Sequence, residues 1–147
     1  MGELIGVATF EKNGLLQKEF SSLCYYNNGR DNVNLCIGTF LNIGDYALSF
    51  DYAIDNVSST SHSKGTFKLF RHPTVNNSEL TGAIFKNVGD ASIYINKQTG
   101  AVYVKLIPYQ YICLKTENIK VKSGYNINFI PDMKTKIDTI EGLTLLS

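Results

Sequence analysis

The clearest pattern of apolar and polar positions lies between residues 99 and 116, where Val, Ile and Tyr dominate. These residue types favour the pleated, half-buried surface of a sheet, and the pattern predicts two strands, 101–107 and 109–115, joined at Pro108. Because proline has no N–H to give to a ladder, Pro108 is expected at a corner or an edge. The alternating positions of the first strand form one apolar face, made of Val102, Val104 and Leu106.

Further strand patterns fill most of the chain, with turn-forming residues between them. They lie at 33–41, 46–54, 65–71, 80–86, 91–96 and 124–130. The turn Asn42-Ile43-Gly44-Asp45 indicates a hairpin between the first two. About eight short strands at regular spacing predict an all-β fold, a jelly-roll-like β-sandwich. For the last segment, 133–147, the pattern leaves a closing strand and a short helix both open.

One helical pattern precedes the strands. Between Gly14 and Tyr26 the apolar residues recur near helical spacing, with Asn13 as a candidate N-cap and Asn27-Asn28-Gly29 as a stop. A helix this short is marginal alone in water, so its apolar stripe must pack on the β domain or on copies of itself. We therefore divide the chain into an N-terminal segment, 1–30, with a short helix, and a β-sandwich, 31–147.

Composition limits the possible partners. The chain has 147 residues, 44% of them hydrophobic, which suffices for one domain with a sizeable core. A net charge of +1 with 18% charged residues gives no basic footprint for nucleic acid. No apolar run reaches the roughly 20 residues that span a bilayer, and the start lacks the features of a signal peptide. We expect no nucleic-acid partner, no membrane insertion and no export signal.

Candidate chemistry is sparse. The three cysteines, Cys24, Cys36 and Cys113, contain no C-x-x-C pair, and we expect free thiols. The two histidines, His62 and His72, stand in polar stretches without a nucleophile or metal ligands at motif spacing. No G-x-S-x-G elbow and no glycine-rich phosphate loop occurs. We therefore predict no enzymatic activity, no cofactor and no metal.

Two polar stretches, 55–64 and 71–79, are the candidates for binding. They flank the short strand 65–71, so in an up-and-down pairing they would emerge at its opposite ends. The first has little to bury and is rich in the donors and acceptors that saccharide hydroxyls require. Solvated connectors without a ligand are the alternative. Tyrosines are also candidates, since their rings stack on sugars, but most lie in predicted strands, where packing in the core or between subunits explains them.

Two pieces of the sequence resemble bacteriophage tail fibres and related receptor-binding proteins. The run T-F-E-K-N-G-L-L-Q-K-E-F-S-S-L, from Thr9 to Leu23, is similar to the A-T-x-x-x-N-G-L-[LM]-S-K-E-x-F-x-x-L run that precedes their distal domain. Gln17 replaces a common Ser, and Phe20 comes one residue early. Downstream, C-I-G-T-F from Cys36 and the later A-V-Y-V-K-L-I-P-Y-Q-Y resemble strands of their C-terminal β heads.

This resemblance implies a virion protein, made in the bacterial cytoplasm, that attaches to a host-surface saccharide or protein without chemistry. It implies a homotrimer joined through the helices at Leu15, Leu16, Phe20 and Leu23. Its receptor loops match the two polar stretches, and the candidate residues there are Asn56, Ser59, Ser61, His62, Lys64, Arg71, His72 and Asn76. A bacterial carbohydrate-binding or adhesin-like β-sandwich module is the alternative, and a small jelly-roll hydrolase or lyase comes third.

Overall fold

The fold is all-β in the part of the chain that the computed structural model describes, residues 23–41, 46–56, 62–71, 79–121 and 129–147. No helix occurs within these ranges. Their eleven strands are β1 Leu23–Tyr26, β2 Val33–Phe40, β3 Tyr46–Asn56, β4 His62–Arg71, β5 Leu80–Val88, β6 Ile93–Ile95, β7 Ala101–Leu106, β8 Gln110–Val121, β9 Phe129–Pro131, β10 Lys136–Ile137 and β11 Thr144–Leu145.

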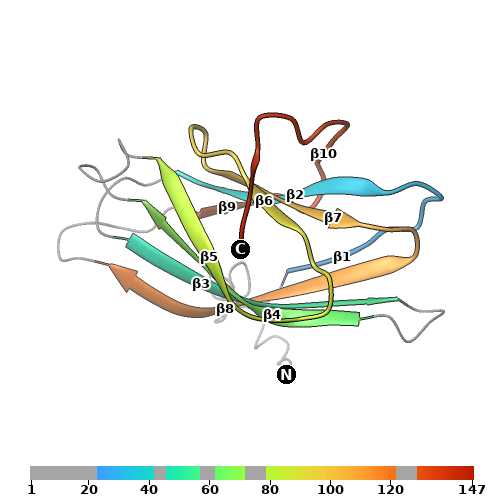
Figure 1. The fold of residues 1–147 in the computed structure, drawn as a ribbon, viewed down its shortest axis with the longest axis horizontal. Helices are drawn as coiled ribbons and strands as arrows, with labels where there is room; N and C mark the ends of the chain where they lie inside the picture. The colour runs from blue at the N-terminus through green and yellow to red at the C-terminus, as the bar shows by residue number, and fades with distance from the viewer. Residues whose placement is uncertain (1–22, 42–45, 57–61, 72–78, 122–128) are drawn as a thin grey trace, which may run out of the picture.

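The strands form two sheets that lie face to face as two layers (Figure 1). One sheet has the order β1-β8-β3-β4-β5, and the other has the order β10-β2-β7-β6-β11, with β9 also paired to β2. All of these pairs are antiparallel. The structure thus confirms the all-β sandwich that the sequence predicts.

The hydrophobic core fills the space between the two sheets. Its centre is aromatic: the ring centroids of Phe50 and Phe67 lie 5.1 Å apart, and those of Phe50 and Phe129 lie 5.2 Å apart. The even positions of β7 face this core, as their alternation predicts, and they are fully buried at Val102, Val104 and Leu106. Period-2 alternation therefore identifies the inward face of this strand correctly.

The corner at Pro108 joins the two sheets. The strands on either side of it, β7 and β8, follow one another in sequence but belong to different sheets. The N–H of Gln110 donates to the carbonyl of Ile107 at 3.2 Å, closing a four-residue turn with Pro108 at its second position. Because Tyr109 lies in this turn, β8 begins one residue later than predicted and continues to Val121.

The predicted hairpin between 33–41 and 46–54 is wrong. Strand β2 pairs with β7, with Leu35 opposite Val104, whereas β3 pairs with β4 and β8. Turn residues predict a change of chain direction, but they do not say whether the next strand stays in the same sheet. Here both strands have a buried face, and the chain passes from one layer of the sandwich to the other.

The predicted helix is wrong over its last four residues, and positions 14–22 lie outside the described residues. Leu23–Tyr26 forms β1, which pairs with β8 so that Leu23 lies opposite Leu114. Leu23 and Tyr25 pack against the core of their own chain, while Cys24 and Tyr26 are exposed on the other face. A four-residue alternation is too short to outweigh the helical spacing of the residues before it.

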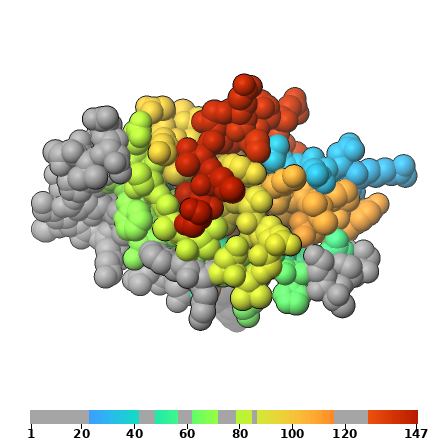
Figure 2. Space-filling model, in the orientation of Figure 1, coloured from blue at the N-terminus to red at the C-terminus, as the bar shows by residue number. Residues whose placement is uncertain are grey.

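The C-terminal segment closes the second sheet with short strands, which decides between the two predictions for 133–147 in favour of strands. It lies on the molecular surface, as the red residues of Figure 2 show. Strand β9 reaches β2 at a bulge, where the register shifts between Cys36 and Gly38. A Cβ at Gly38 would lie 2.3 Å from the Phe129 ring, so only glycine admits this ring. No helix in the described ranges is long and apolar enough to cross a membrane.

Candidate functional site

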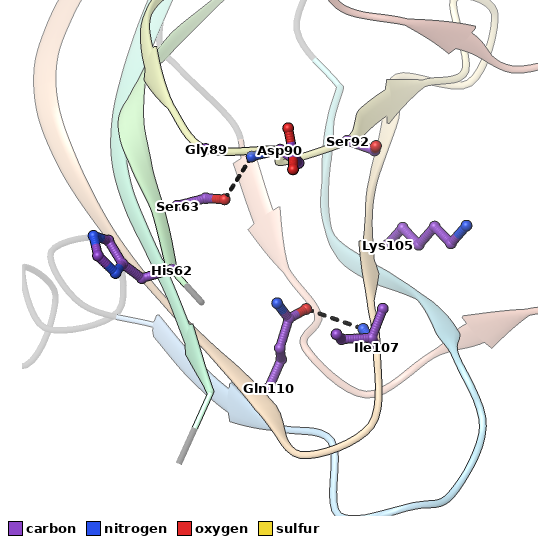
Figure 3. A pocket seen from close by; sticks show the side chains of 8 residues that line it. All are labelled: His62, Ser63, Gly89, Asp90, Ser92, Lys105, Ile107 and Gln110. Atoms are coloured by element: carbon purple, nitrogen blue, oxygen red, sulfur yellow. Dashed lines mark hydrogen bonds between the residues drawn. The ribbon is translucent and has the colours of Figure 1, made fainter. Parts of the chain in front are cut away.

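A polar cavity of about 470 Å³ lies at the end of the sandwich where β7 ends and β8 begins. It takes its walls from both sheets, because β4 and β8 belong to one and the β6–β7 region to the other. Its volume is within the range of small-ligand sites. The residues that line it are labelled in Figure 3: His62, Ser63, Gly89, Asp90, Ser92, Lys105, Ile107 and Gln110.

One wall of the cavity is fixed by a close approach of two main chains. Gly89 has a φ of +101°, and a Cβ there would lie 2.3 Å from Ser63 Oγ and 2.5 Å from the carbonyl oxygen of His62. Only glycine fits this conformation and this contact. The next residue, Asp90, donates its N–H to Ser63 Oγ at 2.9 Å. This bond satisfies the buried serine and presents Asp90 at the cavity.

The opposite wall is built on the turn at Pro108. Gln110 accepts the N–H of Ile107 at its Oε1 over 3.0 Å, and Lys105 donates its N–H to the carbonyl of Ser92 at 3.1 Å. In Figure 3 the side chains of Lys105 and His62 extend away from the other labelled residues. The other polar side chains that line the cavity are those of Ser63, Asp90, Ser92 and Gln110.

Tyr109 stands in the turn between two lining residues and is 42% exposed. Its φ is +66°, a left-handed conformation at the third position of the turn. Glycine or asparagine normally occupies this position when proline precedes it. A bulky residue with positive φ is a genuine outlier, and such strain concentrates at functional sites. Tyr109 is thus an exposed aromatic candidate for ligand contact in the turn that carries the lining residues Ile107 and Gln110.

Asn27 holds the turn that carries Tyr109. It is 2% exposed, and its Nδ2 donates to the carbonyls of Asp31 and Ile107 at 3.1 and 3.0 Å. Its main-chain carbonyl accepts the N–H of Tyr109 at 2.8 Å. From the sequence, Asn27 was predicted only as part of the stop signal of a helix. A buried amide with several main-chain partners is a scaffold residue, and its role depends on residues about 80 positions away.

Two of the predicted binding residues lie at the cavity end of the sandwich. Asn56 ends β3 and donates from Nδ2 to the Pro108 carbonyl at 3.4 Å, and His62 begins β4 opposite Asp55. Lys64 lies farther along β4 on the outer face, where it lines a shallow groove of about 340 Å³. The strand ends that border the stretch 57–61 are therefore next to the cavity, although those five residues lie outside the described part.

Arg71 lies at the other end of β4, as the up-and-down pairing implies, and links the two sheets. Its Nη1 donates to the carbonyl of Phe40 and its Nη2 to the carbonyl of Gln98, each at 3.0 Å. These bonds give Arg71 a structural role, and its receptor contact stays a prediction. The remaining predicted residues lie outside the described ranges: Ser59, Ser61, His72 and Asn76 of the receptor set, and Leu15, Leu16 and Phe20 of the trimer set.

His62 and Ser63 do not form a nucleophile–base pair. As strand neighbours they point to opposite faces of the sheet, and Figure 3 shows the imidazole directed away from the serine hydroxyl. Within the described ranges no group of three or more His, Cys, Asp or Glu side chains is arranged to hold a metal ion. The cavity offers hydroxyl, amide and carboxylate groups, which suit hydrogen bonding to a polar ligand.

A second polar cluster lies at the bulge of β2, away from the cavity. Burial and the nearby Asp132 carboxylate raise the pKa of the Cys36 thiol to about 11. Burial also raises the pKa of Asp132, but hydrogen bonds from the N–H groups of Thr135 and Lys134 outweigh it, and the pKa is lowered overall. Cys36 is therefore a protonated, buried thiol, as the sequence suggests for a small hydrophobic residue.

Comparisons with known proteins found a similar fold in a solved structure. No family model matches the chain, and no curated protein matches it. Among solved structures the chain is similar to WceF of Pantoea stewartii, described as a glycan biofilm-modifying enzyme with a bacteriophage tailspike-like parallel β-helix fold. The TM-score is 0.61 at 9% identity, over 86% of this chain and 22% of that protein.

This chain therefore spans about a fifth of the length of that neighbour. Every strand pair within the described ranges is antiparallel, so this part of the chain is not itself a parallel β-helix. The likeness shows a shared fold over 86% of this chain. It also corrects one prediction: the neighbour is described as an enzyme, so the sequence-based exclusion of enzymatic activity is not supported.

Proposed function

We propose that the chain is a glycan-recognising head of a phage tail fibre or tailspike-like protein, and that the polar cavity with Tyr109 at its edge binds a host-surface saccharide. The observation that carries the proposal is a polar cavity lined by Ser63, Asp90 and Gln110. The strained and exposed Tyr109 lies next to Gln110 in the chain, in the turn that forms one wall of this cavity. An aromatic ring next to hydrogen-bonding side chains is the combination that sugar rings require.

Two further observations support this role. The similar structure is described as tailspike-like and as acting on a glycan, which agrees with the resemblance of the Thr9–Leu23 run to tail-fibre sequences. The cavity also lies at the end of the sandwich where β3 ends at Asn56 and β4 begins at His62, two residues that the sequence analysis gives as candidates for binding. The proposed assembly is a homotrimer, in which three weak sites on one axis raise the avidity.

The test is binding to a panel of purified bacterial exopolysaccharides and O-antigen polysaccharides by the unmodified chain and by two variants. Asp90→Asn removes the carboxylate and leaves the main-chain bond to Ser63 in place. Tyr109→Asn removes the ring and suits the left-handed backbone. We expect each variant to bind about 10-fold more weakly, which corresponds to one lost charged hydrogen bond or one lost ring contact.

Asp138→Asn is the matched control, because Asp138 is an exposed aspartate outside the cavity lining. It should bind as the unmodified chain does. Equal binding by all variants would place the site elsewhere, and binding to none of the polysaccharides would reject glycan recognition. Release of reducing ends during the same incubations shows whether the bound glycan is also cleaved.

A further inference from the structure

Two of the three cysteines stand directly opposite one another on neighbouring strands. Cys24 on β1 and Cys113 on β8 are register partners, between the pairs Tyr25–Ile112 and Leu23–Leu114. The side chains of direct partners lie on the same face of a sheet. Cys24 is exposed and Cys113 is partly buried. The sequence, in which they are about 90 positions apart, gives no sign of this pairing.

The hydrogen bonds of this strand pair show which type of site the cysteines occupy. Next to β1, Asn27 donates its N–H to the carbonyl of Gln110 at 2.8 Å, which makes these two a hydrogen-bonded pair. Pairs alternate along an antiparallel ladder, so Cys24 and Cys113, three residues farther along, form a non-hydrogen-bonded pair. Side chains are closest at such pairs, with Cα atoms about 4.5 Å apart, within the span of a disulfide.

We propose that Cys24 and Cys113 are an oxidisable pair that forms a cross-strand disulfide when the protein meets an oxidising, disulfide-containing environment. The bond would join β1 to β8. Within the described residues, β1 is an edge strand with β8 as its one partner. A disulfide there would hold this edge strand to β8, which lies between β1 and β3 in the sheet.

The chemistry balances with a small-molecule disulfide such as oxidised glutathione as the oxidant. The Cys24 thiolate attacks one glutathione sulfur, forms a mixed disulfide and releases one glutathione thiolate. The Cys113 thiolate then attacks Cys24 Sγ and releases the second. Both cysteine protons end on the two glutathione molecules. The exposed Cys24 is the sulfur that a bulky oxidant reaches first, and the half-buried Cys113 is the resolving thiol.

The second step should be slow at neutral pH and faster at higher pH. Burial, with the hydrogen bond and charge of Cys24 and the charge of Asp55, raises the pKa of Cys113 to about 11. Because only the thiolate attacks, its fraction rises about tenfold for each pH unit below the pKa. In the mixed disulfide Cys24 has no thiol, so burial and the charge of Asp55 are the causes that still raise the pKa of Cys113. We expect the mixed disulfide to resolve faster at pH 9 than at pH 7.

The experiment treats the full chain with oxidised glutathione, labels remaining thiols with iodoacetamide in denaturant and maps the peptides. Before oxidation all three cysteines should be labelled; afterwards only Cys36 should be, with Cys24 linked to Cys113. The melting temperature should rise by roughly 5–15 °C, because the bond closes a loop of about 90 residues. Cys36→Ala is the control and should form the same bond, while Cys24→Ser should gain no stability.

Three results would overturn the proposal. They are full labelling of all three cysteines after oxidation, a glutathione adduct on Cys24 that persists at pH 9, and covalent dimers linked through Cys24. If the Cys36→Ala variant fails to fold, the peptide map of the unmodified chain still decides, since it names the linked residues directly. None of these outcomes depends on glycan binding.

Discussion

Within the described ranges two residues other than glycine have a positive φ, Met133 and Tyr109, and Tyr109 is the exposed one. An L-residue in the left-handed region costs roughly 1–2 kcal/mol relative to its preferred conformations. Tyr109 is 42% exposed, so a large part of its surface is open to solvent and to a ligand. A site selected for stability alone would carry asparagine or glycine after Pro108. A tyrosine at this position is consistent with a contact to a ligand.

Changing Tyr109 to Asn should therefore raise the free energy of unfolding by about 0.5–1 kcal/mol, since asparagine tolerates positive φ. Urea unfolding measures it. Tyr26→Asn is the matched control: Tyr26 is similarly exposed, at 40%, but lies in a strand, where asparagine is unfavourable. That control should lose a few tenths of a kcal/mol. An equal loss in both variants would show that Tyr109 is not strained.

We expect the free energy of unfolding to fall at low pH because of the carboxylate of Asp132. Hydrogen bonds from the N–H groups of Lys134 and Thr135 to Oδ1, at 2.8 and 2.7 Å, favour the charged form and outweigh burial. Because the pKa of Asp132 is lower in the folded state than its ordinary value of 3.8, its contribution to stability is present above about pH 4 and is lost as pH falls through the lowered pKa.

The test is Asp132→Asn, which keeps an oxygen acceptor for both N–H groups but cannot titrate. We expect a shallower decline in the free energy of unfolding between pH 4 and pH 2 than in the unmodified chain, measured by urea unfolding at each pH. Asp138→Asn, at an exposed aspartate, should leave the decline unchanged. If the free energy of unfolding declined equally with pH in all three proteins, the charge of Asp132 would not stabilise the fold.

At the scale of elements, Arg71 joins the two sheets at the end opposite the cavity. Arg71 is the last residue of β4. Its guanidinium donates to the carbonyl of Phe40, at the end of β2, and to the carbonyl of Gln98, in the turn before β7. Gly100 makes room for it, because a Cβ there would lie 2.7 Å from Arg71 Nη1 and 2.2 Å from the Phe40 carbonyl oxygen. The planar fork of arginine suits two carbonyls at once.

Arg71→Ala should accordingly lower the free energy of unfolding by about 1–3 kcal/mol, because two carbonyls lose a charged donor. Chemical denaturation measures the loss. Arg71→Lys should recover only part of it, since an ammonium is a point charge rather than a fork. Arg30→Ala, at an exposed arginine, is the control and should change stability by less than about 0.5 kcal/mol. A loss no larger than that of the control would refute the structural role.

The elements also show what a single sequence can and cannot predict. Alternation identified the buried face of β7 because Val102, Val104 and Leu106 need only a local period of two. It failed at β4, which begins at His62, inside a stretch predicted as a polar loop, because Ser63 is buried through its bond with Asp90 rather than through apolar character. The bond joins residues 27 positions apart, and local composition cannot reveal it.

The candidate site was predicted only at its border for the same reason. Asn56 and His62 were found because they are polar residues in a stretch with little to bury. Asp90 and Gln110 were missed because each is one polar residue near a strand end, and they come together only when β5, β7 and β8 are placed. The sequence did indicate the position of one wall of the site, because a proline between two predicted strands, Pro108, marks the corner that carries Tyr109.

At the scale of the whole molecule, the sandwich separates its two polar ends. The cavity lies where β3 ends and β4 begins, while the Arg71 link lies where β4 ends, some ten residues away along the strand. The cavity end can therefore face a ligand, while the end with Arg71 holds the two sheets together. The N-terminal strand β1 ends at the cavity side, since Tyr26 lies opposite Tyr111 at the start of β8.

The last prediction concerns assembly. We propose a homotrimer through Leu15, Leu16, Phe20 and Leu23. Of these, Leu23 is partly buried against the core of its own chain, so the test uses Leu16 and Phe20. Leu16→Asp combined with Phe20→Asp should release monomers, since burial of large apolar side chains contributes about 1.5–3 kcal/mol each and aspartate reverses it. Sedimentation at micromolar concentration measures the mass.

Lys12→Asp combined with Lys18→Asp, which changes polar positions of the same segment, is the control and should keep the parent mass. Glycan-coated surfaces add a second readout: the released monomer should keep its intrinsic affinity in solution but dissociate from the surface much faster, because effective concentration is lost. The trimer proposal would be refuted if the parent chain sedimented as a monomer, or if the Leu16→Asp, Phe20→Asp variant kept the parent mass.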